Sequence, residues 1–193
     1  MPAELIELRV RDVTIKLHRG GRGQKVLFLH GAGGVPQWLP FFDALAERYE
    51  LLVPEHPGFG GSDDPPWIHS MPDLAMFYLD LVEEAGLDRI LALTPSEVQL
   101  DLMLKNRFTV AKLGWQPRWF NPDLEKWLHR IKLPALVVWG DDDKIMPAAN
   151  APLWREHLPD ARLVMVDKCG HLPHVEQPAI VAGQILDFLE GVV

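Results

Sequence analysis

The sequence has only one cysteine, Cys169, among its 193 residues. A single cysteine excludes an internal disulfide bond and is typical of a protein from a reducing compartment, so we expect a cytoplasmic location. The sequence also lacks an excess of positive charge, because its formal net charge is −8. Binding to nucleic acid needs clustered lysine and arginine side chains opposite the phosphates. We therefore expect no nucleic-acid partner.

Long apolar runs and short metal-ligand spacings are lacking as well. No run approaches the roughly 18 apolar residues that a membrane-spanning helix needs, and the first residues do not have the pattern of a signal peptide. This predicts no membrane association. No His-x-x-x-His or Cys-x-x-Cys spacing occurs, so we predict neither a metal nor another cofactor. The alternative is a metal site formed by His30, His56, Asp143 and His171.

Apolar runs of strand length alternate with segments whose apolar residues recur at helical spacing. This alternation predicts an α/β fold with a mainly parallel sheet flanked by helices, and the length suits a single domain over residues 1–193. The fold is expected to begin with a hairpin over residues 5–17 that has a glycine-rich turn at 19–23. Further strands are expected at 26–29, 51–53, 90–93, 135–139 and 162–166, and helices at 38–49, 74–86, 95–113, from 121, at 148–158 and from 180 to a cap at Gly191.

Residues 168–178 follow the strand expected at 162–166, and His171 lies in this segment directly after Gly170. A histidine on a loop that leaves a strand is held by a rigid scaffold and still reaches a cleft, which is where a catalytic base can act. In mainly parallel sheets, catalytic groups gather at the carboxyl ends of the strands. We therefore take His171 as a candidate catalytic base.

Four loop segments have distinctive motifs, and each follows an expected strand. The segments are His-Gly-Ala-Gly-Gly at 30–34, Pro-Gly-Phe-Gly-Gly-Ser at 57–62, Gly-Asp-Asp-Asp-Lys-Ile-Met-Pro at 140–147 and Gly-His-Leu-Pro-His-Val-Glu-Gln-Pro at 170–178. Together they resemble the α/β-hydrolase family. The resemblance covers residues 5–90 and about 95–193, and it is nearest to the small esterases and carbon–carbon bond hydrolases of that family.

The resemblance implies a role for four residues of these segments. His171 would be the catalytic base, and Asp143 would accept the Nδ1–H of its ring and orient it. The alternative for this pair is an ordinary surface contact. Gly31 and Ala32 would form the oxyanion loop, with the Ala32 N–H as a donor. The ligand would be a small apolar ester or ketone-like compound.

The nucleophile of this family, a serine in Gly-x-Ser-x-Gly, is missing from the sequence. We interpret this as a deletion in the middle of the catalytic domain. Ser96 is the one substitute at the right count, seven residues after Arg89. Branched residues, Thr94 and Val98, stand where the elbow needs glycine. The competing interpretation is a helix start, with Thr94 as N-cap and Glu97 closing a capping box.

Residues 95–130 resemble part of a helical cap, which would be reduced here. Trp115 in this segment either lines an apolar substrate cleft or fills the core of the cap itself.

Three hypotheses on function follow from these features. The first is a hydrolase homologue that keeps the oxyanion, acid and histidine loops but has little or no activity. The second is an active serine hydrolase that uses Ser96, His171 and Asp143. The third is an incomplete fold whose open strand edges are completed by self-association into a homo-oligomer.

Overall fold

The computed structural model describes residues 3–35, 37–87, 90–92, 109, 112 and 124–191. The chain divides into two compact units, Met1–Phe120 and Asn121–Val193. Ser96, Trp115 and most of the cap-like segment 95–130 lie outside the described residues. The single domain over residues 1–193 stays a prediction.

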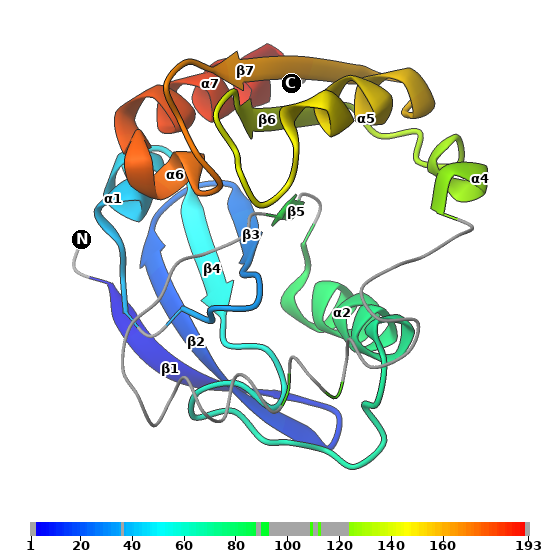
Figure 1. Cartoon of the computed structure of the whole chain (residues 1–193). Coiled ribbons are helices and arrows are strands. Elements are labelled where there is room, and N and C mark those ends of the chain that lie inside the picture. The colour runs from blue at the N-terminus through cyan, green and yellow to red at the C-terminus, as the bar shows by residue number, and fades with distance from the viewer. Residues whose placement is uncertain are drawn as a thin grey trace. The chain divides into compact units, whose positions relative to one another are not determined.

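The first unit contains a five-stranded sheet in the order β1-β2-β4-β3-β5 (Figure 1). Strand β2 pairs antiparallel with β1 and β4, whereas β3 pairs in parallel with β4 and β5. The strand expected at 90–93 is therefore confirmed as a member of the sheet. The strands are β1 (Glu4–Val10), β2 (Val13–Gly21), β3 (Lys25–Leu29), β4 (Glu50–Pro54) and β5 (Ile90–Ala92).

The N-terminal hairpin is present, but the predicted position of its turn is wrong. Strands β1 and β2 pair in register up to their ends, so the chain reverses at Arg11 and Asp12, with Arg11 at φ 53°. Gly20 and Gly21 belong to the end of β2 instead, and Gly23 follows it. A Cβ atom on Gly21 would lie 2.0 Å from the carbonyl oxygen of Tyr49. Glycine is thus required there by close packing and not by the hairpin turn.

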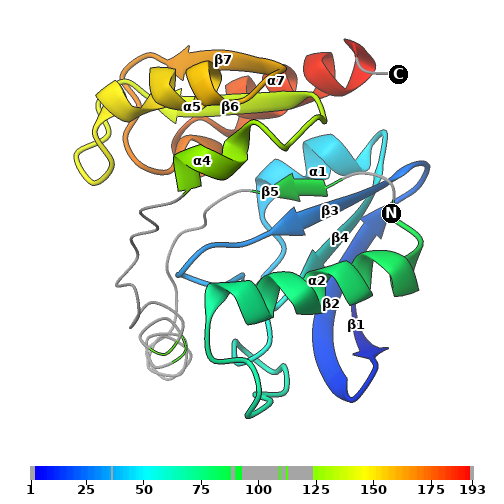
Figure 2. The same ribbon diagram turned by 90° about the vertical axis from the view of Figure 1, so that its right-hand side faces the viewer.

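Helices α1 (Pro40–Ala46) and α2 (Met71–Ala85) cover opposite faces of this sheet. Leu27 of β3 belongs to the apolar cluster beneath α2, whereas the ring of Phe28 packs 4.7 Å from that of Phe42 on α1. Successive side chains of a strand point to opposite faces, which places the two helices on the two sides (Figure 2). Helix α2 ends at Ala85 and is capped by Gly86, with φ 61°, as its sequence predicts.

The second unit is built on a two-stranded parallel sheet of β6 (Ala135–Gly140) and β7 (Ala161–Val166). Its last helix includes Gly191, so Gly191 is not the cap that the sequence predicts. The helix expected from 148 begins with a 3-10 turn, because Pro152 occupies the first turn of the α-helix that follows. The helices are α4 (Leu124–Leu128), η1 (Ala148–Asn150), α5 (Ala151–His157), α6 (Pro173–Glu176) and α7 (Pro178–Gly191).

Candidate active site

Strands β6 and β7 bring the acid loop and the histidine loop to one edge of the second unit. Their parallel register runs from Ala135 opposite Ala161 to Gly140 opposite Val166. Both strands therefore end at the same edge, where the loops 141–147 and 167–172 begin. Two loops that are far apart in the sequence start side by side for this reason.

Hydrogen bonds join these two loops close to the strand ends. The Asp142 N–H donates to the Cys169 carbonyl over 2.9 Å, and the Cys169 N–H donates to Asp141 Oδ1 over 3.2 Å. A Cβ atom on Gly140 would lie 2.1 Å from the carbonyl oxygen of Gly170. Only glycine at position 140 allows the loops to approach this closely.

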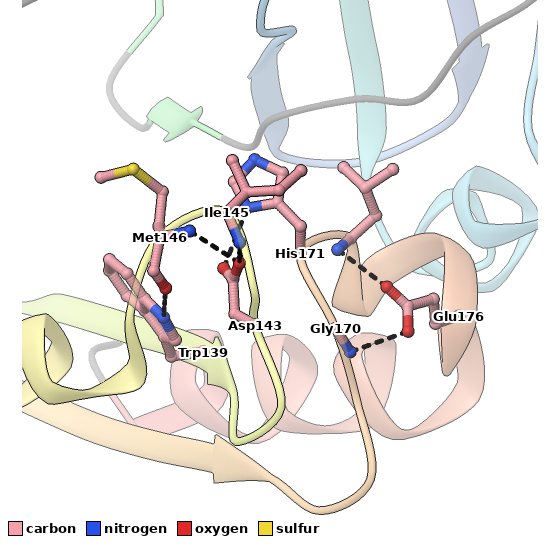
Figure 3. A network of polar contacts seen from close by, with 8 residues as sticks. Trp139, Asp143, Ile145, Met146, Gly170, His171 and Glu176 are labelled. Carbon is pink, nitrogen blue, oxygen red and sulfur yellow. Dashed lines mark hydrogen bonds and ion pairs between the residues drawn. The ribbon is translucent and has the colours of Figure 1, made fainter.

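Asp143 is held by the loop that carries it. Its Oδ1 accepts the N–H groups of Ile145 and Met146, each over 2.8 Å. The indole N–H of Trp139 donates to the Met146 carbonyl over 3.1 Å and so fixes the far side of the loop (Figure 3). Burial of Asp143 favours its protonated form, but the hydrogen bonds from His171, Met146 and Ile145 outweigh it and lower the pKa of the carboxyl. Asp143 is therefore ionised at neutral pH.

The second oxygen of Asp143 contacts the ring of His171. The distance from His171 Nδ1 to Asp143 Oδ2 is 2.9 Å, and the side chains are 30% and 5% exposed, respectively. An ionised carboxylate only accepts, so Nδ1 carries the proton and Nε2 is left with its lone pair in the neutral ring. This is the arrangement of a general base oriented by a carboxylate.

Glu176 holds the backbone on both sides of His171. The Gly170 N–H donates to Glu176 Oε2 over 2.8 Å, and the Leu172 N–H donates to Oε1 over 3.0 Å (Figure 3). Charge-assisted hydrogen bonds of this kind are about twice as strong as neutral ones. The sequence gives a signal for this contact, a carboxylate five residues after the histidine in a helical turn, but its role was not predicted.

The other ionisable groups near the histidine loop do not resemble reactive groups. Cys169 is fully buried, and burial raises the pKa of its thiol, so it is protonated and inert. His174 is 2% exposed, and burial lowers its pKa to about 4. Asp142 forms an exposed ion pair with Lys144. Among the described residues, no group of three or more His, Cys, Asp or Glu side chains could hold a metal ion.

Gly31 and Ala32, the candidate oxyanion residues, lie in the first unit on the loop after β3. The Gly31 carbonyl accepts the Gly34 N–H over 3.2 Å and lies 2.7 Å from His30 Nδ1. Ala32 is exposed, and within the described part of the chain its N–H donates to no partner. An N–H without a partner, on a turn that hydrogen bonds hold, is what an oxyanion donor requires.

The glycine-rich loop after β4 is structural. Ser62 Oγ donates to the Glu55 carbonyl over 2.8 Å and accepts the Lys16 N–H over 2.9 Å. The Glu55 carboxylate accepts the Gly61 N–H over 2.6 Å. A Cβ atom on Gly60 would lie 2.0 Å from that carboxylate. The loop therefore folds around Glu55, and Ser62 is a bridging hydroxyl and no nucleophile.

Comparisons with known proteins agree on one family. The alpha/beta hydrolase fold family matches residues 25–93 and 100–178. The chain is 35% identical to a 2-hydroxy-6-oxononadienedioate/2-hydroxy-6-oxononatrienedioate hydrolase of Paraburkholderia phymatum, over 86% of this chain and 54% of that protein. It is 41% identical to a poly(3-hydroxyalkanoate) depolymerase of Ectopseudomonas oleovorans, over 42% of this chain and 25% of that protein. The chain spans between 21% and 56% of the length of the first four curated relatives.

Solved structures share the fold. The 2-hydroxy-6-oxo-6-phenylhexa-2,4-dienoate hydrolase BphD from Rhodococcus sp. strain RHA1 superposes with a TM-score of 0.72 at 17% identity, covering 98% of this chain and 100% of that one. The carboxylesterase CesB from Bacillus subtilis has a TM-score of 0.77 at 15% identity, covering 100% and 93%. The family match spans more than half of the residues, so the chain belongs to the α/β-hydrolase fold family.

Proposed function

We propose that this protein is a hydrolase homologue of the esterase and carbon–carbon hydrolase kind that keeps a general base but has weak turnover. The observation that carries the proposal is the 2.9 Å hydrogen bond between His171 Nδ1 and Asp143 Oδ2. A lone histidine on a surface would not need a buried carboxylate that two backbone N–H groups also hold. The weakness follows from the sequence, which contains no Gly-x-Ser-x-Gly.

The proposed chemistry is the transfer of a proton to His171 Nε2. In this family the proton comes from the nucleophile, and a base of this kind contributes about 10²–10⁴ to the rate. Without a serine on an elbow, the base can act only on water or on a poorly placed hydroxyl. Ala32 N–H would stabilise the developing oxyanion, which is worth about 3–4 kcal/mol when the donor is correctly aimed.

The proposed ligand is a small apolar ester or a ketone-like carboxyl compound. This rests on the relatives, whose names include a methyl ester esterase and a hydrolase of an oxo-diene dicarboxylate. Because the chain spans only about half of each of these two proteins, their substrates come to this chain only as a proposal.

Slow hydrolysis of a p-nitrophenyl ester tests the proposal. We expect the wild type to exceed the buffer rate by a small factor, and His171→Ala to fall to the buffer rate because the base is gone. His129→Ala is the matched control, since His129 is an exposed histidine of the same unit. A His171→Ala variant that retains the wild-type rate would contradict the proposed base.

Ser96 remains the candidate nucleophile of the alternative, an active serine hydrolase. Treatment with a fluorophosphonate probe, followed by mass spectrometry of the intact and digested protein, distinguishes the active serine hydrolase from the weak homologue. We expect no adduct at Ser96. Stoichiometric labelling of Ser96, together with complete loss of turnover in Ser96→Ala, would instead establish the alternative.

Self-association through strand edges, the third hypothesis, also stays a prediction. Within the described residues, no strand pairs with the outer edge of β5 in the first unit or of β6 in the second. Open edges of this kind favour pairing with another chain.

A further inference from the structure

Three polar side chains, His30, His56 and Tyr78, form a connected group inside the first unit. They are 4%, 6% and 8% exposed. The two imidazole rings stack with their centroids 3.5 Å apart, and the ring of Phe59 packs edge-on against both. Polar groups this deeply buried destabilise a fold unless they are hydrogen-bonded, so their partners decide what the group does.

The hydrogen bonds of the group determine which ring nitrogens carry protons. His56 Nε2 lies 2.6 Å from the His30 carbonyl, which only accepts, so Nε2 carries the proton. His56 Nδ1 then accepts from the hydroxyl of Tyr78. His30 Nε2 accepts the backbone N–H of His56 over 3.0 Å. The proton of the His30 ring is therefore on Nδ1, which donates to the Gly31 carbonyl over 2.7 Å.

The electrostatics keep both rings neutral. Burial lowers the pKa of His56 to about 4. Burial, and then the neighbouring His56, lower the pKa of His30 well below its usual value. Burial raises the pKa of Tyr78, so its hydroxyl keeps its proton. Around neutral pH the donors and acceptors of the group thus have a single consistent arrangement.

The hydrogen bonds of the group end at the peptide unit between Gly31 and Ala32, which carries the proposed oxyanion donor. The Gly31 carbonyl and the Ala32 N–H belong to the same planar trans peptide, so they point in opposite directions. The Gly31 carbonyl is held from one side by His30 Nδ1–H and by the Gly34 N–H. Fixing the carbonyl therefore fixes the direction of the exposed Ala32 N–H.

We propose that Tyr78 and His56 are positioning residues, which aim the Ala32 N–H by holding His30 and, through it, the Gly31 carbonyl. Neither side chain is accessible to a reacting atom, because both are buried. The proposal rests on the proposed function in one respect, which is the role of Ala32 as the oxyanion donor. The competing view is that the group only satisfies buried polar atoms of the core.

The substitution Tyr78→Phe tests the proposal by removing only the hydroxyl that donates to His56 Nδ1. Tyr49→Phe is a matched control, since Tyr49 is the other tyrosine of the chain and is also 8% exposed. The readout is NMR of the free protein, which requires no turnover. We expect three changes in Tyr78→Phe: the His56 Nδ1 resonance moves towards that of a nitrogen without a donor, the Gly31 carbonyl and Ala32 amide resonances shift, and exchange of the His56 N–H accelerates about fivefold.

The comparison with unrelated amides separates positioning from general destabilisation. Amides of the β1–β2 ladder should exchange at the wild-type rate in Tyr78→Phe, and Tyr49→Phe should leave the Gly31 and Ala32 resonances in place. The proposal is overturned if Tyr78→Phe leaves Gly31 and Ala32 unshifted, or if all amides of the unit accelerate equally.

Turnover provides a second and independent readout. If the wild type hydrolyses an ester, Tyr78→Phe should lower kcat about tenfold at an unchanged KM, because misaiming an oxyanion donor weakens binding of the transition state alone. A wild type without turnover would overturn the proposed function and leave the NMR comparison valid. A wild type with turnover that Tyr78→Phe does not change would overturn the positioning role alone.

Discussion

At His171, two carboxylates have separate tasks. The Asp143 carboxylate orients the ring through Nδ1, and the Glu176 carboxylate holds the backbone N–H groups of the residues before and after His171. The ring and the backbone are thus restrained independently. A base must stay within about 0.5 Å of its productive position to act, so both restraints bear on function.

Replacement of Glu176 by glutamine should loosen the histidine loop. The amide keeps one acceptor oxygen but presents N–H₂ to the other backbone N–H, which leaves a donor without a partner. We expect a loss of about 1–2 kcal/mol in the free energy of unfolding, and faster hydrogen exchange at Gly170 and Leu172. Urea denaturation and NMR exchange measure the two effects. The control is Glu156→Gln, at an exposed position on α5, which should change neither the stability nor the exchange rates. Equal losses in both variants would argue against the role of Glu176 in holding the histidine loop.

Single residues were predictable where a motif fixes their spacing from a strand. His171 and Asp143 were named from their loops, and the structure has the hydrogen bond between them. Their catalytic roles stay predictions. Glu176 and Tyr78 were not predicted, because their partners are backbone or ring atoms whose direction depends on the folded conformation of a loop.

At the scale of elements, the close approach of two loops constrains the second unit most tightly. The strand ends of β6 and β7 place Gly140 directly against the backbone of the histidine loop, where a Cβ atom would lie 2.1 Å from Gly170 O and 2.3 Å from Cys169 O. Backbone atoms cannot move away as the end of a flexible side chain can. The geometry of the acid and the base therefore depends on a glycine that takes no part in the chemistry.

The substitution Gly140→Ala should separate the two loops. We expect a loss of about 2–4 kcal/mol in the free energy of unfolding, the range for overpacked interiors, together with a weakened contact between His171 and Asp143. The matched control is Gly183→Ala in α7, where a Cβ atom meets nothing within 4 Å and alanine should stabilise the helix by about 0.5–1 kcal/mol. Thermal and chemical denaturation of both variants measure these changes in stability. Similar changes in the two variants would contradict the close approach of Gly140 to the histidine loop.

Strands were predictable because their apolar runs are long and bounded by turn residues. The turn of the N-terminal hairpin was misplaced, because a non-glycine residue, Arg11, adopts φ 53° there and the glycines serve packing at Gly21. Glycines therefore do not mark the position of a turn when close packing requires them elsewhere.

At the scale of the whole chain, the four loop motifs were enough to identify the family, and the single domain over residues 1–193 stays a prediction beside the two compact units. None of the described helices has the length and apolar character required to cross a membrane. The missing elbow is a property of the sequence, and ester hydrolysis measures its effect on turnover.

Buried histidines in both units, among them His56 and His174, should make the stability of the whole chain fall in mild acid. Burial lowers the pKa of His56 and of His174 from 6.5 to about 4. In the unfolded chain both titrate near 6.5, so between pH 6.5 and 4 the unfolded state binds more protons than the folded state, and stability decreases as the pH falls. Each histidine contributes at most about 3 kcal/mol to this loss at pH 4.

Guanidinium titrations at about pH 7, 5.5 and 4.5 measure this loss. In His174→Gln the side chain no longer titrates, so the slope of stability against pH should become shallower for the second unit, even if the variant is less stable at every pH. His129→Gln, at an exposed position, should keep the wild-type slope. A wild type whose stability is constant from pH 7 to pH 4.5 would show that the two rings are not held neutral, and a slope unchanged in His174→Gln would show that His174 is not the group responsible in its unit.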